Sequence, residues 1–81
     1  MLTDYIRGAM HQAIYEILSD DGSFYGEIPG FQGVWANAST LEACREELQS
    51  ALEDWILVRT ADHLELPIVD GIDLNLRQEV A

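Results

Sequence analysis

One stretch constrains the fold of this chain more than any other, because residues 40–61 carry apolar residues at helical spacing. These residues lie three or four positions apart and form one stripe along a helix; they are Leu41, Cys44, Leu48, Ala51, Leu52, Trp55 and Ile56. Ser39 or Thr40 can cap this helix, and Ser39 with Glu42 matches a capping box. Such a stripe packs against another layer of structure, so the rest of the chain is expected to supply a matching apolar face.

The segments before this helix predict a small antiparallel sheet. Residues 3–11 repeat apolar residues at helical spacing behind Thr3, a candidate cap, and predict a short N-terminal helix. Strand patterns follow at residues 13–18, 23–28 and 34–38, separated by turn-forming residues. Sequential strands with short connections favour an antiparallel meander, and the stripe of the long helix is expected to cover one of its faces.

The turn of the first hairpin can be argued from its charges. A three-residue loop at Asp20-Asp21-Gly22 sets Leu18 opposite Phe24 and places apolar residues on one face. A two-residue loop would instead set Glu16 directly opposite Glu27, and like charges in that position destabilise a strand pair. We therefore predict the three-residue loop, with a positive φ at its glycine.

The C-terminal quarter predicts one more strand. Residues 62–71 read as a connection that contains Pro67, and Ile72–Leu76 alternates between apolar and polar residues, as a strand with one apolar face does. The fold class is therefore α+β, with a three-stranded antiparallel meander, a crossover helix, a fourth strand and a short N-terminal helix. The 81 residues are enough for one domain, spanning residues 1–81, with a modest core.

The charge balance restricts the partners of this chain. Fifteen acidic residues stand against four basic ones, all of them arginines, and the formal net charge is −11. Nucleic acids and anionic membranes would be repelled, because affinity for phosphate depends on lysine and arginine. A basic protein would be attracted, and we expect such a partner. The alternative is that the charge serves solubility alone.

The sequence also favours a cytoplasmic location. Cys44 is the single cysteine, so no internal disulfide can form, as is usual in a reducing compartment. The N-terminus lacks the apolar run of a signal peptide, and the longest aliphatic or aromatic run, Trp55–Val58, is too short to span a membrane.

A set of carboxylates allows a second interpretation. Glu16, Glu42 or Glu46, and Asp73 fall on predicted strands and a helix, and nucleases that use two divalent ions hold them with carboxylates from several such elements. With this many acidic residues, however, such a match is expected by chance, and no basic pattern is present to hold RNA. We therefore expect no catalysis, no metal and no cofactor, and keep a degenerate or weak metal-dependent nuclease using Glu16, Glu46 and Asp73 as the alternative.

The third predicted strand suggests an interaction surface. Trp35 and Asn37 alternate with Val34, Ala36 and Ala38, so Trp35 is expected on the side of the sheet away from the long helix. The candidate contact residues for a partner or a second copy are Phe31, Val34, Trp35, Asn37 and Tyr25. Alternatively, the N-terminal helix covers this side.

We also expect the chain to form a homo-oligomer, a dimer or larger. A core this small gains apolar burial when two copies join. The third predicted strand carries neither a charge nor a proline to prevent pairing with another chain, and we expect the contact there.

Three short motifs resemble a known family. They are Ile-Pro-Gly-Phe-Gln-Gly at residues 28–33, Thr-Leu-Glu-Ala at 40–43 and Leu-Pro-Ile at 66–68, in the order in which HicB antitoxins of type II toxin–antitoxin pairs carry similar motifs. This resemblance covers residues 13–71. It implies a truncated ribonuclease H-like fold with sheet order 3-2-1-4, and a bacterial or archaeal cytosolic protein. It also implies a partner, a small basic HicA-type toxin that cleaves mRNA.

The chain departs from that family in two places. Many HicB proteins carry a C-terminal DNA-binding domain, and the residues that follow Gly71 are too few to form one, so we expect no operator binding by this chain alone. Val69 also stands where the second proline of the family's exit motif is usual. We therefore expect a non-catalytic protein-binding module, either an antitoxin or an orphan relative of one.

Overall fold

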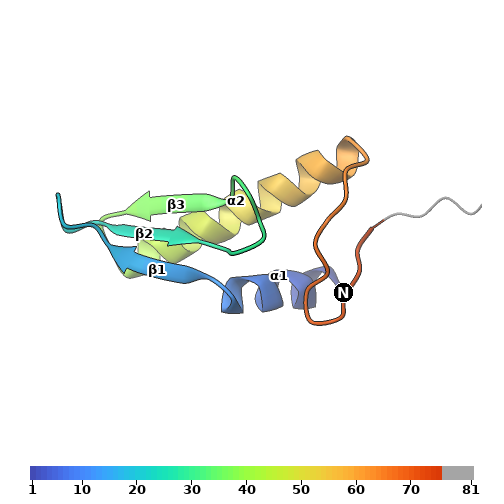
Figure 1. Ribbon diagram of the computed structural model, residues 1–81, viewed down its shortest axis with the longest axis horizontal. Helices are drawn as coiled ribbons and strands as arrows, with labels where there is room; N and C mark the ends of the chain where they lie inside the picture. The colour runs from blue at the N-terminus through green and yellow to red at the C-terminus, as the bar shows by residue number, and fades with distance from the viewer. Residues whose placement is uncertain (76–81) are drawn as a thin grey trace, which may run out of the picture.

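Two helices and a three-stranded antiparallel sheet make up the computed structural model, which describes residues 1–75 (Figure 1). The elements follow in the order α1 (Leu2–His11), β1 (Ile14–Ile17), β2 (Phe24–Glu27), β3 (Trp35–Ala38) and α2 (Leu41–Ala61). The predictions of an α+β class, a three-stranded meander and both helices are thus confirmed.

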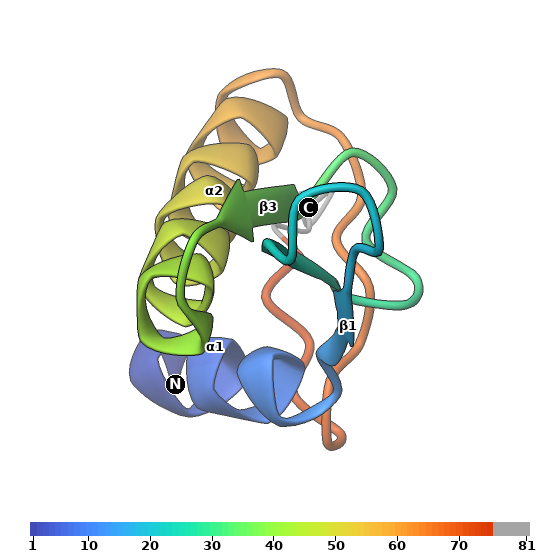
Figure 2. The same ribbon diagram turned by 90° about the vertical axis from the view of Figure 1, so that its left-hand side faces the viewer.

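The long helix covers only part of the sheet. The strand order is β1-β2-β3, and α2 packs against β3 and β2 but does not reach the backbone of β1. Figure 2 shows α2 on one side of the sheet, with α1 alongside α2. We call the side of the sheet that faces away from α2 the outer face.

The core lies between the two helices, the sheet and two connecting segments. It contains apolar residues from α1, α2, β3, the loop after β2 and the segment after α2, namely Tyr5, Ala9, Met10, Ile28, Phe31, Val34, Ala36, Cys44, Leu48, Leu52, Ile56, Leu66 and Val69. Four residues of the predicted α2 stripe are buried, while Ala51 and Trp55 are partly buried against the core and Leu41 is 46% exposed. Thr40, rather than Ser39, caps α2, since its Oγ1 accepts a hydrogen bond from the Ala43 amide at 3.1 Å.

The N-terminal helix is anchored to the segment after α2. Tyr5 is fully buried, and its hydroxyl donates a hydrogen bond to the carbonyl oxygen of Pro67 at 2.6 Å. Met1 rather than Thr3 precedes the first helical turn, so the predicted cap lies within α1 and makes no capping hydrogen bond.

The predicted register of the first hairpin is wrong. Gly22 does adopt a positive φ, of 71°, but Ile17 rather than Leu18 lies opposite Phe24, and Glu16 lies opposite Tyr25. The loop is one residue longer than predicted, because the Leu18 amide donates to the Ser23 carbonyl at 2.8 Å and the Gly22 amide donates to the Leu18 carbonyl at 2.9 Å. The Ser23 amide also donates to a carboxylate oxygen of Asp21 at 2.9 Å, an Asx turn that favours this longer loop.

The predicted fourth strand is not formed by residues 72–75, and Leu76 lies outside the described residues. A tight turn explains the difference: Asp70 and Gly71 have φ values of 49° and 77°, and Val69 and Ile72 exchange both of their backbone hydrogen bonds. Asn75 then bonds through its side chain to the amide of Leu66 at 2.6 Å and to the carbonyl of Leu66 at 3.0 Å. These bonds hold the segment against residues 66–69 rather than against β1.

Candidate partner-binding face

Strand pairing sets six side chains on the outer face in two rows. Directly paired residues point to the same side of a sheet, so each row crosses all three strands. The first row is Ile14, Glu27 and Trp35, and the second row is Glu16, Tyr25 and Asn37. The face therefore combines exposed apolar and aromatic groups with two carboxylates.

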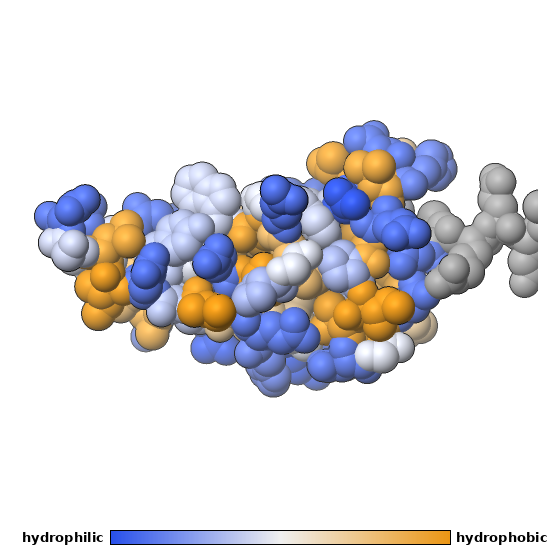
Figure 3. Space-filling view, viewed as in Figure 1, coloured by the Kyte–Doolittle hydropathy of each residue, from blue (hydrophilic) through white to orange (hydrophobic). Residues whose placement is uncertain are grey.

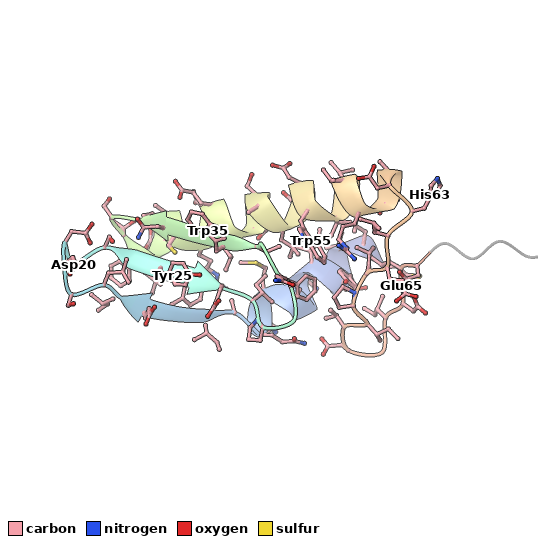
Figure 4. All side chains as sticks on the ribbon, turned by 45° about the horizontal axis from the view of Figure 1, so that its top comes forward. Asp20, Tyr25, Trp35, Trp55, His63 and Glu65 are labelled. Atoms are coloured by element: carbon pink, nitrogen blue, oxygen red, sulfur yellow. The ribbon has the colours of Figure 1, made fainter. Side chains whose placement is uncertain are left out.

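The two aromatic residues of this face are stacked on one another. The rings of Tyr25 and Trp35 have centroids 6.3 Å apart and an interplanar angle of 23°, and Figure 4 shows the two side chains next to each other on the sheet. Trp35 is 58% exposed, which confirms that it points away from α2. The alternative, in which the N-terminal helix covers this side, is wrong, because the apolar residues Tyr5 and Met10 of α1 are buried in the core instead.

Asn37 is held in place by the neighbouring strand. Its side-chain amide donates hydrogen bonds of 2.9 Å to the Ser23 hydroxyl and 2.9 Å to the Phe24 carbonyl oxygen. Both amide hydrogens are therefore engaged within the hairpin. The carbonyl of the side chain is the part of Asn37 that remains available as an acceptor.

Phe31 and Val34 do not lie on the outer face. Both side chains are buried, and the ring of Phe31 packs against Tyr5 at 6.3 Å and against Trp55 at 5.2 Å between centroids. Of the five residues predicted as contacts, the structure thus brings Tyr25, Trp35 and Asn37 together on one surface. Phe31 and Val34 instead anchor the loop of residues 28–34, which borders the outer face, because their side chains are buried in the core.

The electrostatic field on the outer face is negative. Partial burial, with the carboxylates of Glu27 and Glu16 adding to it, raises the pKa of the Tyr25 phenol. Within residues 1–75 the ion pair that forms joins Arg7 to Asp4 at 3.5 Å, so no described arginine neutralises these two carboxylates. Sequence reasoning did not name Ile14 or Glu27 as contact residues. Alternation along β2 sets Glu27 on the same side as Tyr25, whereas Ile14 could be placed there only with the correct register of the first hairpin.

Apolar side chains are distributed over this side of the molecule rather than collected in one patch. Figure 3 shows them in separate places with hydrophilic residues between them. A shallow groove of about 380 Å³ runs beside Trp35, and it is lined by Tyr25, Glu27, Trp35 and the residues of the 28–34 loop. The described residues on this side therefore form no extended apolar patch onto which another apolar surface could pack. They form instead a small site that combines aromatic rings with a carboxylate.

The carboxylates of the alternative interpretation are not brought together. Glu16 lies on the outer face, Glu46 is exposed on α2 on the other side of the sheet, and Asp73 lies in the segment after α2. Glu42 is exposed in the first turn of α2. Among residues 1–75, no three histidine, cysteine, aspartate or glutamate side chains form a group that could hold a metal ion. The same part of the chain contains no helix long and apolar enough to cross a membrane.

The meander, its covering helix and the exposed aromatic face define a small α+β module, and the comparisons identify its family. The family model described as UPF0150-like matches residues 4–67, and the chain belongs to this family, which is associated with toxin–antitoxin systems. The crystal structure of TTHA0281 from Thermus thermophilus is similar over 95% of each chain, with 37% sequence identity and a TM-score of 0.84. No curated protein matches the chain.

Proposed function

We propose that this chain is an antitoxin-like binding module of the HicB type, which acts by binding a small basic HicA-type mRNA-cleaving toxin and not by catalysis. The observation that carries the proposal is the match of residues 4–67 to a family associated with toxin–antitoxin systems. The net charge of −11 supports a basic partner, because opposite charges steer the two proteins together. The carboxylates of the outer face lie beside exposed rings, as in an interface that recognises cations.

The three-stranded part of the fold is compatible with this proposal. The order β1-β2-β3 followed by α2 corresponds to the first part of a ribonuclease H-like arrangement, and we infer that this chain uses that part as a binding scaffold. We also propose a cytoplasmic location. RNA binding by this chain alone is not expected, because its field repels phosphate.

Co-expression tests the proposed function. If a small basic protein is encoded next to this chain, its expression alone should arrest growth, co-expression of this chain should restore growth, and the two proteins should co-purify. Recovery of growth with co-purification supports the proposal. If the neighbouring protein is toxic and this chain neither binds it nor restores growth, the antitoxin assignment is wrong. A gel shift with RNA at physiological salt gives a separate check, in which saturable micromolar binding would contradict the proposal.

We further propose that the free protein self-associates through an edge of the sheet. Both β1 and β3 are edges in the described part of the chain, because residues 72–75 pair with neither strand. The backbone of β1 is the less protected of the two, since α2 does not reach it and its Ile17 is 66% exposed. An uncovered edge of this kind pairs readily with another chain.

A further inference from the structure

We propose that the groove beside Trp35 is a docking site for an arginine side chain of a basic protein partner. This inference rests on the proposed function and specifies where, and with what chemistry, the partner is held. The groove is open to solvent and has a volume of about 380 Å³, with Tyr25, Glu27 and Trp35 among the residues that line it. One end of it is bounded by the loop of residues 28–34.

The aromatic walls suit a flat cation. Tyr25 and Trp35 stack with their rings 23° from parallel, and Trp35 is 58% exposed to solvent. A guanidinium group stacks on such a ring through its planar face and keeps its N–H donors free for other partners. A lysine ammonium gains less, because it is a compact and more strongly hydrated charge.

Two carboxylate residues are paired with the aromatic residues and can supply acceptors for those N–H donors. Glu27 pairs directly with Trp35 across the sheet, and Glu16 pairs directly with Tyr25. Directly paired residues have Cβ atoms about 4.5–5.5 Å apart, so each ring has a carboxylate beside it. A guanidinium stacked on Trp35 could donate to the Glu27 carboxylate, and such charge-assisted bonds are short and strong.

The same chemistry is already present on another surface of this chain. The guanidinium of Arg59 lies over the Trp55 ring at 4.8 Å from its centroid, while its Nε donates to the Glu65 carbonyl oxygen at 2.8 Å. Trp55 thus has its arginine within the chain, and no described arginine is paired with the carboxylates beside Trp35. The exposed ring of Trp35 and its neighbouring carboxylates therefore present similar chemistry to an arginine from outside the chain.

Charge selects the partner class. A nucleic acid would bring phosphates to two carboxylates, which is unfavourable. A second copy of this chain would bring its own net charge of −11, so a basic protein is the occupant that fits best. Self-association through β1 leaves the groove open, because Trp35 lies on β3 at the opposite edge of the sheet.

Peptides can test the site without the natural partner. The full chain is labelled with ¹⁵N and titrated with the peptide Gly-Arg-Gly-Arg-Gly, and with its lysine counterpart, at physiological salt. We expect the indole N–H signal of Trp35 to shift while that of Trp55 stays, and the arginine peptide to bind about two- to fivefold more tightly than the lysine peptide. Glu27→Gln and Trp35→Leu should each weaken the arginine peptide by a similar factor.

Glu46→Gln is the matched control, because it removes the same charge from the exposed side of α2. If it weakens binding as much as Glu27→Gln, or if both peptides bind equally, the groove acts only through the net field and the proposal is wrong. It is also wrong if the Trp35 signal depends on protein concentration without peptide, since a second copy then occupies the groove. Should Trp35→Leu unfold the chain, the exposed Glu27→Gln still decides.

The outcome for the groove is separable from that for the proposed function. If the Glu27→Gln variant neutralises the toxin as well as the unaltered chain does, the groove is not the docking site while the antitoxin assignment stands. If the unaltered chain binds the arginine peptide as expected but neutralises no toxin, the antitoxin assignment fails while the groove stands.

Discussion

The phenol ring of Tyr15 lies across Gly26, its direct partner on the neighbouring strand. A Cβ atom built on Gly26 would come within 2.9 Å of two ring carbons of Tyr15 and within 3.2 Å of Cys44 Sγ. The absence of a side chain at residue 26 thus lets an aromatic ring of β1 reach the core on the α2 side of the sheet. Because α2 does not reach β1, this contact is what joins the side chain of Tyr15 on β1 to the core.

Gly26→Ala should therefore destabilise the fold, by about 1–3 kcal/mol, because the added methyl group overpacks this contact. Denaturant unfolding measures the change. The Tyr15→Leu variant and the double variant complete a cycle, in which the cost of Gly26→Ala should shrink once the ring is gone. Equal costs in both backgrounds would show that the Tyr15 ring is not the cause.

Two leucines of α2 provide a matched test of the core. Leu48 is fully buried, whereas Leu57 is 68% exposed on the same helix. We expect Leu48→Ala to cost about 2–5 kcal/mol through lost burial and the cavity left behind, and Leu57→Ala to change stability by no more than about 0.5 kcal/mol. A loss below about 1 kcal/mol for Leu48→Ala in denaturant titration would contradict the packing of α2 on the sheet.

Tyr5 links stability to alkaline pH. Burial, with the charge of Asp73 adding to it, raises the pKa of the Tyr5 phenol above its ordinary value of 10.0. The folded chain therefore holds this proton more tightly than the unfolded chain. The stability that this provides is complete below the unfolded pKa, and it is lost as the pH rises through the folded pKa.

Tyr5→Phe should accordingly cost about 0.5–1.5 kcal/mol at neutral pH, because the partly buried carbonyl of Pro67 loses its hydrogen-bond donor. The difference from the unaltered chain should narrow as the pH rises above about 10, where ionisation of Tyr5 destabilises only the chain that has it. Urea unfolding at neutral and alkaline pH measures both values. A difference that stays constant across this range would contradict the role of Tyr5 in the pH dependence.

Local patterns in the sequence predicted every helix and strand of the described chain, but they did not predict how the pieces meet. The stripe of α2, its cap and the alternation around Trp35 depend on residues close in sequence, and the structure agrees with them. The hairpin register failed because the backbone bonds of Leu18 and the Asx turn of Asp21 favour a longer loop than the pairing of apolar residues suggested.

The alternation after Gly71 was the most misleading signal. Residues 72–75 have a strand pattern, yet the side chain of Asn75 bonds to the backbone of Leu66, and the turn at Asp70 directs the chain back on itself. Side-chain bonds between distant residues leave no periodic trace in a sequence. The face around Trp35 was only partly predicted, because the place of Ile14 on it depends on the register of the first hairpin.

Gly8 shows how packing can reverse a local preference. Alanine is favoured over glycine within a helix by about 1 kcal/mol, so helix propensity by itself favours Gly8→Ala. In the structure, a Cβ at this position would lie 2.8 Å from Val69 Cγ1 and would also collide with the Asp70 carboxylate. The Asp70 side chain is exposed and can move, but Val69 is buried.

We therefore expect Gly8→Ala to lower stability by about 1 kcal/mol in net terms, because overpacking outweighs the gain in helix propensity. Thermal unfolding measures it. In a chain that already carries Val69→Ala, adding Gly8→Ala should cost less stability than it does in the unaltered chain, because the contact with Val69 Cγ1 is gone. A Gly8→Ala variant that is more stable than the unaltered chain would show that α1 does not pack closely on the turn at residues 69–71.

Self-association at the edge of β1 can be tested with a pair of lysine substitutions. Ile17 is 66% exposed on β1, and Trp35 is 58% exposed on β3, so either residue can be replaced by lysine without disturbing the core. A lysine on an edge strand opposes pairing with another chain.

We expect the unaltered protein to be a dimer or larger in sedimentation equilibrium. It should associate more tightly at moderate than at low salt, since a net charge of −11 on each chain opposes contact. Ile17→Lys should give a monomer and Trp35→Lys should not. The reverse pattern would place the contact on β3, the edge that the sequence favoured, and a monomer at tens of micromolar in both salts would exclude self-association through either edge.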